Sequence, residues 1–489
     1  MIVLLLFIIP LVAGLVSFLI KNGTAARLCA LLSALATLVV AIIAVKTKLG
    51  ADALQFSAPW MGLLGSSFSL RLDGMSQLLC LLNAVAYPLI IAATWHTTYF
   101  KVHRLLALLL LTQAGMMGVF TAVDGLLFYF FWELALIPMY FLCSLWGGER
   151  RIPVTFKFFI YTFTGSVLML VALLYVYSQT PDGSFALESL YGARLSNHAQ
   201  TGVFWALFAA FAVKMPVWPF HTWQPDTYEQ SPTVATMVLS GVMVKMGLFG
   251  VVRWLLPIAP IASYAWGDVV MSLSVIGILY ASILAMQQKD LKRLIAYSSI
   301  AHVGLMVMAI FAETHSGIQG MMMQLFNHGI NIIGLWIVVA LIERQFGTRN
   351  LDQLGGIAQK APGLTALLVV VALANVSLPL TNAFVGEFLM FNGIFSSTGT
   401  KYNVVFTVLA LISIILSAVY TLNMIQKVFF GSTSSITQNA HYIRINERLV
   451  LGLIVVMILA FGVYPQPLLN LTENFTNQLL PQLSISNSR

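Results

Sequence analysis

Residues 204–220 read FWALFAAFAVKMPVWPF, and this stretch decides how the rest of the sequence is interpreted. Its lysine, Lys214, lies within an apolar segment far from any loop, and Pro216 and Pro219 follow it. A lysine at the centre of a bilayer costs about 2.5–3.5 kcal/mol on insertion scales, so it usually marks a path for ions or protons. Non-helical backbone at membrane depth is tolerated only where it is buried in protein or lines a wet cavity. The stretch therefore predicts a transporter with a broken transmembrane helix.

The composition of the whole chain is that of a membrane protein. Of its 489 residues, 59% are hydrophobic and only 9% are charged, whereas a soluble domain usually carries about 25% charged residues. Apolar runs of about 20 residues recur from end to end, which excludes a soluble domain with a single anchor. The first run, residues 1–20, lacks the features of a cleaved signal peptide and is expected to be the first span. We predict an all-α polytopic membrane protein with a single membrane domain over residues 1–489.

About fourteen transmembrane helices are predicted from the apolar segments. Their approximate limits are 1–20, 26–45, 75–96, 104–122, 124–145, 153–178, 202–220, 232–256, 268–288, 292–311, 318–343, 362–395, 403–430 and 447–465. The longest polar connections in the first half are residues 46–74 and 179–201.

Two of the predicted spans are interrupted, and their spacing suggests an internal repeat. The seventh span is broken at residues 214–219, and the twelfth, which reads ALANVSLPLTNAFVGEF, is interrupted at Pro379 and Gly386. Breaks five spans apart suggest two five-helix repeats, spans 4–8 and 9–13, the second inverted relative to the first, as in many transporters. The predicted organisation is an N-terminal three-helix segment, two repeats, and a last helix with its tail, over residues 1–96, 104–256, 268–430 and 447–489.

The charges in the loops predict the orientation of the chain. Sixteen of the 25 lysines and arginines fall on one predicted side of the membrane, and seven, among them Arg253 and Arg489, fall on the other. The remaining two, Lys214 and Lys245, lie within predicted spans. This asymmetry places both termini in the periplasm or its equivalent. The net charge of +8 does not imply a nucleic-acid partner, because the basic residues are scattered in short loops.

The sequence contains no motif for a cofactor or a metal. Cys29, Cys80 and Cys143 lie in apolar runs without the CxxC spacing of a metal or iron–sulfur site. A glycine-rich loop of the P-loop or dinucleotide-binding type is also missing. We therefore expect no cofactor in this chain, and the energy that drives transport must come from elsewhere.

Four ionisable side chains are expected near the midplane of the bilayer. Helix rise places Glu133, Lys214 and Lys245 roughly 13–20 Å from one end of their spans, in a hydrocarbon core about 30 Å thick. Glu387, which follows the break in the twelfth span, lies roughly 12 Å from the other surface. Ionisable groups at this depth are expected to be functional. The alternatives are structural: a fixed ion pair, an interfacial lysine, or a permanently protonated carboxyl group.

Glu133 and Lys214 are predicted to form an ion pair, because each charge would keep the other ionised inside the membrane. A nearby third charge could then break the pair and free the proton of the lysine. Buried pairs that merely hold two helices together are the alternative, although such pairs are often replaceable by apolar packing. A static role alone would not explain the helix break beside Lys214.

Histidines supply further candidates. His302 and His328 lie in consecutive spans and could pass protons, since the pKa of histidine is close to neutral; ordinary packing roles are equally open. His221 and Asp226 lie at the mouth of the broken seventh span. They could be groups at which protons are taken up, or simply loop residues.

Four motifs, LFYFFWELALIPMYFL, FAVKMPVWPFHTWQPD, QQKDLKRLIAYSSIAHVG and LPLTNAFVGEF, together resemble the antiporter-like membrane subunits of respiratory complex I, the NADH–quinone oxidoreductase. The resemblance covers nearly the whole chain and extends to Mrp antiporter subunits. It implies a fourteen-helix fold in the bacterial inner membrane and proton translocation through two half-channels joined by a midplane row of charges. It also implies that this chain has no redox site, and that FMN, iron–sulfur clusters and quinone belong to partner subunits.

The resemblance also assigns roles to single residues. Glu133 matches the family's fifth-helix glutamate, and Lys214 matches its broken-helix lysine. Lys245 matches the eighth-helix lysine that connects the half-channels, and Glu387 matches the twelfth-helix acid. Subunits L and N and the Mrp homologue resemble one another in having lysine at this last position, so Glu387 sets the chain apart from them.

The resemblance implies partners as well. These are the other membrane subunits of complex I (L-, N-, K-, A-, J- and H-like), the peripheral redox arm and the lipid bilayer. The alternative is a subunit of an Mrp-type Na⁺/H⁺ antiporter, in which unwound carbonyl groups near Asn375 and Asn382 could bind sodium. A third class is a scaffold without a channel of its own, for which the midplane charges would be dispensable.

Overall fold

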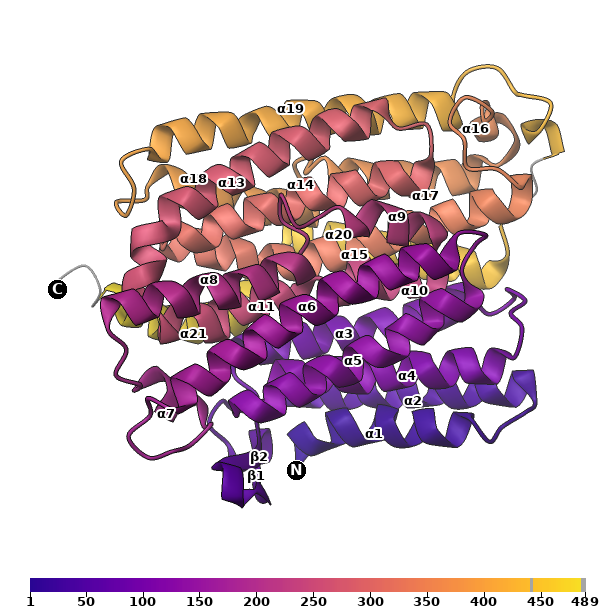
Figure 1. The fold of residues 1–489 in the computed structure, drawn as a ribbon. Helices are drawn as coiled ribbons and strands as arrows, with labels where there is room; N and C mark the ends of the chain where they lie inside the picture. The colour runs from indigo at the N-terminus through magenta and orange to yellow at the C-terminus, as the bar shows by residue number, and fades with distance from the viewer. Residues whose placement is uncertain (440–442, 485–489) are drawn as a thin grey trace.

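The computed structural model describes residues 1–439 and 443–484, so Arg489, one of the counted loop charges, lies outside the described residues. The chain forms a bundle of long helices that run side by side in both directions (Figure 1). The first part contains α1 to α6, which are Ile2–Ser17, Gly23–Lys46, Gly74–Ala93, Val102–Thr121, Gly125–Trp146 and Arg151–Tyr177. The connection between α2 and α3 contains η1, β1, η2 and β2, which are Asp52–Leu54, Gln55–Met61, Gly62–Leu64 and Ser66–Arg71.

The remaining elements follow in chain order. The middle part contains α7 to α9, which are Leu187–Tyr191, Asn197–Lys214 and Trp223–Gln230, and then α10, η3, α11, η4 and α12, which are Thr233–Val238, Leu239–Met243, Lys245–Gly250, Val251–Leu255 and Leu256–Ile258. Next come α13 to α18, which are Pro260–Gln287, Leu291–Phe311, His315–Phe346, Ile357–Lys360, Pro362–Asn375 and Asn382–Phe395. The chain ends with α19, η5, α20 and α21, which are Asn403–Val428, Thr437–Asn439, Ile445–Val463 and Gln466–Ser484.

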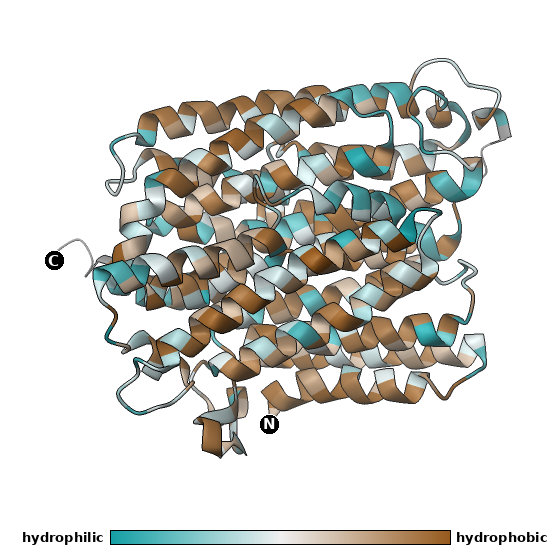
Figure 2. Cartoon of the chain, in the orientation of Figure 1, coloured by the Kyte–Doolittle hydropathy of each residue, from teal (hydrophilic) through white to brown (hydrophobic). Residues whose placement is uncertain are grey.

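The predicted helical membrane fold is confirmed. Among the described residues, eleven helices are long and apolar enough to cross a membrane, and they coincide with eleven of the fourteen predicted spans. The other three predicted spans are the shorter helix α1 and the two broken pairs, α8–α9 and α17–α18. Hydrophobic residues cover most of α1 and α19, and hydrophilic residues gather toward the ends of the bundle (Figure 2). Exposed apolar side chains such as Val12 and Ile415 fit a surface that faces lipid.

Both predicted breaks are present. Pro216 and Pro219 lie between α8 and α9, and Pro379 lies between α17 and α18; proline cannot donate the backbone hydrogen bond that a continuous helix needs. The first pair runs from α8 on the left of Figure 1 to α9 on the right, and the second from α17 on the right to α18 on the left. The two broken pairs therefore cross the bundle in opposite directions.

Gly386 does not interrupt the twelfth span, contrary to the prediction, because it lies inside α18. A Cβ atom at this position would be 2.7 Å from Oε1 of Gln324 on α15. The glycine therefore serves close packing between α18 and α15 rather than a break in the helix.

The eighth span is less regular than the sequence predicts. Two π-helical turns, η3 and η4, lie before and after α11, the short α-helix that begins with Lys245. The glycines that flank this lysine admit neighbouring helices closely, as expected from their size. A Cβ atom at Gly241 would be 2.8 Å from Ile333 of α15, and one at Gly247 would be 2.7 Å from the backbone oxygen of Phe211 in α8. π-helical turns are often found at functional sites.

Two elements at one end of the bundle were not predicted. The polar connection 46–74 forms an antiparallel hairpin of β1 and β2. Directly after the last span, α21 packs against α3 and α15 with Leu468, Phe475 and Leu479 buried. We call the end of the bundle that carries this hairpin and α21 the N-terminal face, and the other end the opposite face (Figure 1).

Candidate functional site

Lys245 is completely buried at the start of α11. Its Nζ donates to the backbone oxygen of Ser240 at 2.6 Å and lies 2.9 Å from Nδ1 of His328 on α15. The π-helical turn η3 directly precedes this lysine. The ammonium group therefore has two polar partners in an interior that is otherwise apolar.

The contacts continue from His328 through three more helices. Nε2 of His328 lies 3.3 Å from Oγ of Ser299 on α14, and its ring centroid lies 5.6 Å from that of His302 on the same helix. Nδ1 of His302 lies 3.1 Å from Oε1 of Glu387 on α18. We call Lys245, His328, His302 and Glu387 the central row. All four side chains are buried.

Polar side chains hold the second break against the central row. Nδ2 of Asn327 donates to the backbone oxygen of Asn382 at 2.7 Å, and the side-chain amides of Asn331 and Asn382 exchange two hydrogen bonds of 3.0 and 3.1 Å. Oγ of Ser298 accepts from Nδ2 of Asn375 at 3.1 Å and from the hydroxyl of Tyr420 at 3.0 Å. This network fixes both ends of the break between α17 and α18. Asparagines beside a proline break in an apolar segment are the signal that could have revealed it.

The predicted ion pair between Glu133 and Lys214 is not formed. Oε1 of Glu133 and Nζ of Lys214 have no hydrogen-bond partner among the residues that the structure describes. Instead, Nζ of Lys214 lies 5.6 Å from the ring centroid of Trp132 and 6.0 Å from that of Phe158, which are cation–π distances. Lys214 is also the last residue of α8, where the helix dipole favours a positive charge. Two aromatic rings and a helix end thus take the place of the expected carboxylate.

The two residues proposed for proton uptake lie near each other but differ in their contacts. His221 is buried between α8 and α9, with its ring centroid 5.2 Å from that of Tyr280. Asp226 on α9 forms ion pairs with Lys157 at 2.9 Å and Arg293 at 3.0 Å. Asp226 is therefore part of an ion-pair cluster, whereas His221 is not recorded in an ion pair within the described part of the chain.

Arg253 corrects the count of loop charges, because it is buried in η4 rather than exposed in a loop. Its Nη1 and Nη2 lie 2.5 and 2.7 Å from the carboxylate oxygens of Asp73. Asp73 also caps α3 by accepting from the backbone N–H of Ser76 at 3.0 Å. Burial alone would raise the pKa of Asp73, but the Arg253 guanidinium holds that pKa below its ordinary value.

Comparisons with known proteins agree with this architecture. Residues 122–417, which contain the whole central row, match the family described as NADH:quinone oxidoreductase/Mrp antiporter, TM. The chain is 37% identical to NADH-quinone oxidoreductase subunit M of Rhodobacter capsulatus, over 94% of this chain and 92% of that protein. It belongs to this family of membrane subunits. Rickettsia bellii has a subunit M that is 36% identical, over 86% of this chain and 84% of that protein.

A solved structure gives the same result for the fold of this family member. One chain of the structure described as respiratory complex I from Thermus thermophilus with bound NADH is 30% identical. The match covers 98% of this chain and 100% of that chain, with a TM-score of 0.89. The family membership predicted from the four motifs, and the likeness to subunit M indicated by Glu387, are confirmed.

Proposed function

We propose that this chain is the M-type membrane subunit of an NADH–quinone oxidoreductase and that it moves protons along the central row. Its relatives from Rhodobacter capsulatus and Rickettsia bellii carry the name subunit M. The observation that carries the proposal is the arrangement of the central row itself. Four buried ionisable groups from four helices follow one another in contact, although no ionisable group is needed to pack an apolar core.

Each member of the row can take part in proton transfer. His328 presents Nδ1 to Lys245 and Nε2 to Ser299, so its ring can accept a proton on one nitrogen and release one from the other. The 5.6 Å between the two imidazole centroids can be bridged by a ring rotation or by one water molecule. His302 then meets Glu387, where the row ends.

The direction of transfer follows from the predicted orientation. The charge asymmetry of the loops places the N-terminal face in the periplasm of a bacterial inner membrane. Protons taken up at the opposite face, near His221, would reach Lys245, pass the two histidines and leave through Glu387. α18 continues from Glu387 to Phe395, toward the N-terminal face (Figure 1).

Glu133 and Lys214 are proposed to couple this row to the neighbouring subunit. Because the two are not in contact, Lys214 keeps its charge through aromatic rings and a helix end, and it can respond to a change of charge nearby. Glu133 is only partly buried on α5, which leaves it open to a neighbour in the membrane arm. A charge arriving beside Glu133 would shift the proton affinity of Lys214 and start transfer toward Lys245.

The redox chemistry is proposed to take place in partner subunits. FMN, iron–sulfur clusters and quinone would bind there, and this chain would contribute translocation only. The proposed partners are the peripheral arm and the other membrane subunits of the L-, N-, K-, A-, J- and H-like types. Co-purification of the chain with those redox subunits is the expected result.

An Mrp-type Na⁺/H⁺ antiporter subunit is less well supported. The relatives reported above are named as subunits of NADH-quinone oxidoreductase. The backbone oxygen of Asn382, one of the carbonyl groups considered for sodium, already accepts a hydrogen bond from Asn327. Proton pumping that is unchanged when sodium is removed supports the complex I assignment.

The decisive experiment compares Glu387→Gln with wild type in the purified complex, reconstituted into liposomes. Glutamine keeps the size and polarity of the side chain but cannot bind a proton. Proton uptake driven by NADH is expected to fall at least about tenfold, the lower end of what a positioned proton-transfer group contributes. Glu149→Gln, an exposed carboxyl on a loop, is the matched control. Normal pumping by an assembled Glu387→Gln complex would falsify the proposal.

A further inference from the structure

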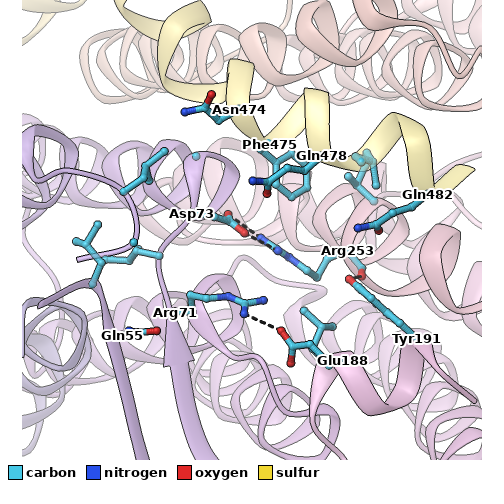
Figure 3. Close-up of a pocket in the computed structure, with 18 of the residues that line it drawn as sticks. Gln55, Arg71, Asp73, Glu188, Tyr191, Arg253, Asn474, Phe475, Gln478 and Gln482 are labelled. Carbon is cyan, nitrogen blue, oxygen red and sulfur yellow. Dashed lines mark hydrogen bonds and ion pairs between the residues drawn. The ribbon is translucent and has the colours of Figure 1, made fainter. Parts of the chain in front are cut away.

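A cavity of about 370 Å³ lies at the N-terminal face, beneath α21 (Figure 3). One wall comes from α21, which presents Asn474, Gln478 and Gln482 to it. These side chains are four residues apart and so lie on one face of the helix. A cavity lined by amides and charges is polar enough to hold water. It brings the aqueous side of the membrane inward along the eighth span.

Arg253 forms the inner wall of this cavity. Asp73 holds its guanidinium with two contacts, and Oγ of Ser76 lies 3.2 Å from Nη2. The guanidinium carbon lies 5.0 Å from the ring centroid of Phe475 on α21 and 5.4 Å from that of Phe249. The arginine thus connects the eighth span, the start of α3 and the covering helix α21, with its charge between two aromatic rings.

Phe249 separates Arg253 from the central row. It lies four residues after Lys245 and four before Arg253, so all three fall near one side of the eighth span. Its side chain is completely buried and packs edge-on against Phe120, with ring centroids 5.6 Å apart. Moving outward from Lys245, the eighth span therefore presents an aromatic plug, a guanidinium and a polar cavity.

The short distance between this cavity and Lys245 creates a problem for a pump. Eight residues of helix separate Lys245 from Arg253, which is only about 12 Å of rise. Water that crossed this gap would connect the middle of the central row directly to the N-terminal face. Protons would then bypass His328, His302 and Glu387, and could flow back along the same route.

We propose that Phe249, Arg253 and Asp73 form a proton-tight seal between this cavity and Lys245. An apolar constriction excludes water, and a fixed positive charge repels protons, as at other selective pores. Arginine suits this role because it stays charged and cannot pass a proton on. Asp73 holds the guanidinium across the route, and α21 covers it from outside. The seal rests on the proposed pumping function, because it makes the end of the row at Glu387 the way out.

The test measures passive proton leak in liposomes that contain the whole complex. A pH gradient is imposed without NADH, and its decay is followed with an enclosed pH-sensitive dye. Arg253→Gln and Phe249→Ser are expected to speed the decay several-fold. Arg253→Lys keeps the charge and Phe249→Leu keeps the apolar plug, so both are expected to hold the gradient nearly as wild type does. Arg71→Gln, which removes a pair with Glu188 on the exposed side of the same cavity, is the control for the cavity wall.

A second variant shows where the leak passes. Adding Lys245→Ala to either leaking variant is expected to return the decay to the wild-type rate. If Arg253→Gln does not assemble, Phe249→Ser carries the test alone. Wild-type decay in assembled Arg253→Gln and Phe249→Ser complexes would overturn the seal, and so would a loss of pumping without any leak, which would make the cavity an outlet. Failure of the pumping function is read separately, because it leaves NADH-driven uptake normal in Glu387→Gln.

Discussion

Nδ1 of His302 lies 3.1 Å from Oε1 of Glu387, and this contact joins α14 to the second half of the broken twelfth span. The same carboxylate oxygen accepts from Nε2 of Gln324 at 3.4 Å. Gly386 allows α15 to approach so closely that the glutamine reaches this position. The break in the twelfth span therefore places a carboxylate at the end of a row that begins at Lys245, three helices away.

His302→Gln tests whether this histidine transfers protons or only packs. Glutamine can still donate a hydrogen bond to Glu387 but cannot carry a proton. NADH-driven proton uptake is expected to fall by about tenfold or more, with little loss of assembled complex. His198→Gln, at an exposed position near the start of α8, is the control. Unchanged uptake would leave His302 a packing residue.

Glu133→Gln separates function from stability. Pumping and quinone-coupled turnover are expected to be lost together, because the proposed signal from the neighbouring subunit acts through this carboxylate. The free energy of unfolding should change by less than about 1 kcal/mol, since breaking a buried ion pair costs about 3–5 kcal/mol and no such pair is formed here. Turnover, proton uptake and thermal stability of one preparation provide the three measurements. Normal pumping by the assembled variant rules out the gating role.

Asn382→Ala tests the amide network that holds the second break. The substitution removes two hydrogen bonds to Asn331 and leaves a buried amide without a partner. A loss of about 1–3 kcal/mol in stability is expected, seen as a lower midpoint of thermal unfolding in detergent. Asn392→Ala removes one exposed hydrogen bond to Ser316 and should change stability by no more than about 0.5 kcal/mol. Equal effects of the two substitutions would contradict the assigned importance of the network.

Glu313 gives a prediction about pH. It lies in the turn between α14 and α15, and burial raises its pKa to about 7. Between its ordinary pKa and this value, the folded chain holds a proton that the unfolded chain has lost, so stability falls as pH rises through this window. Glu313→Gln is expected to unfold at a higher temperature than wild type at pH 8 and at a similar temperature at pH 5. The same difference at both pH values would contradict the assigned titration.

Much of the fold could be predicted because its causes are local. Apolar runs locate the long helices, and prolines beside polar residues locate both breaks, which the structure contains at Pro216 and Pro379. α21 escaped prediction because it is amphipathic rather than uniformly apolar, so no hydropathy criterion for spans detects it. The π-helical turns around Lys245 depend on packing against α8 and α15, which the local sequence does not encode.

The site was predictable by residue but not by contact. Depth and charge identify each of the buried ionisable groups, yet the row joins four helices, and His302 and Glu387 are 85 residues apart. The expected pair of Glu133 and Lys214 fails because the sequence does not show that Trp132 and Phe158 surround the ammonium group. Arg253 was taken for a loop charge because a polar residue near a helix end looks like the membrane boundary.

The central claim is that Lys245, His328, His302 and Glu387 carry protons as one row. The most direct measurement is the number of protons moved per NADH oxidised by the reconstituted complex with Lys245→Ala, compared with wild type and with Lys401→Ala at an exposed loop position. The account predicts that Lys245→Ala lowers the turnover rate and the number of protons moved per NADH, while Lys401→Ala leaves both unchanged. Wild-type rate and stoichiometry in an assembled Lys245→Ala complex would contradict it.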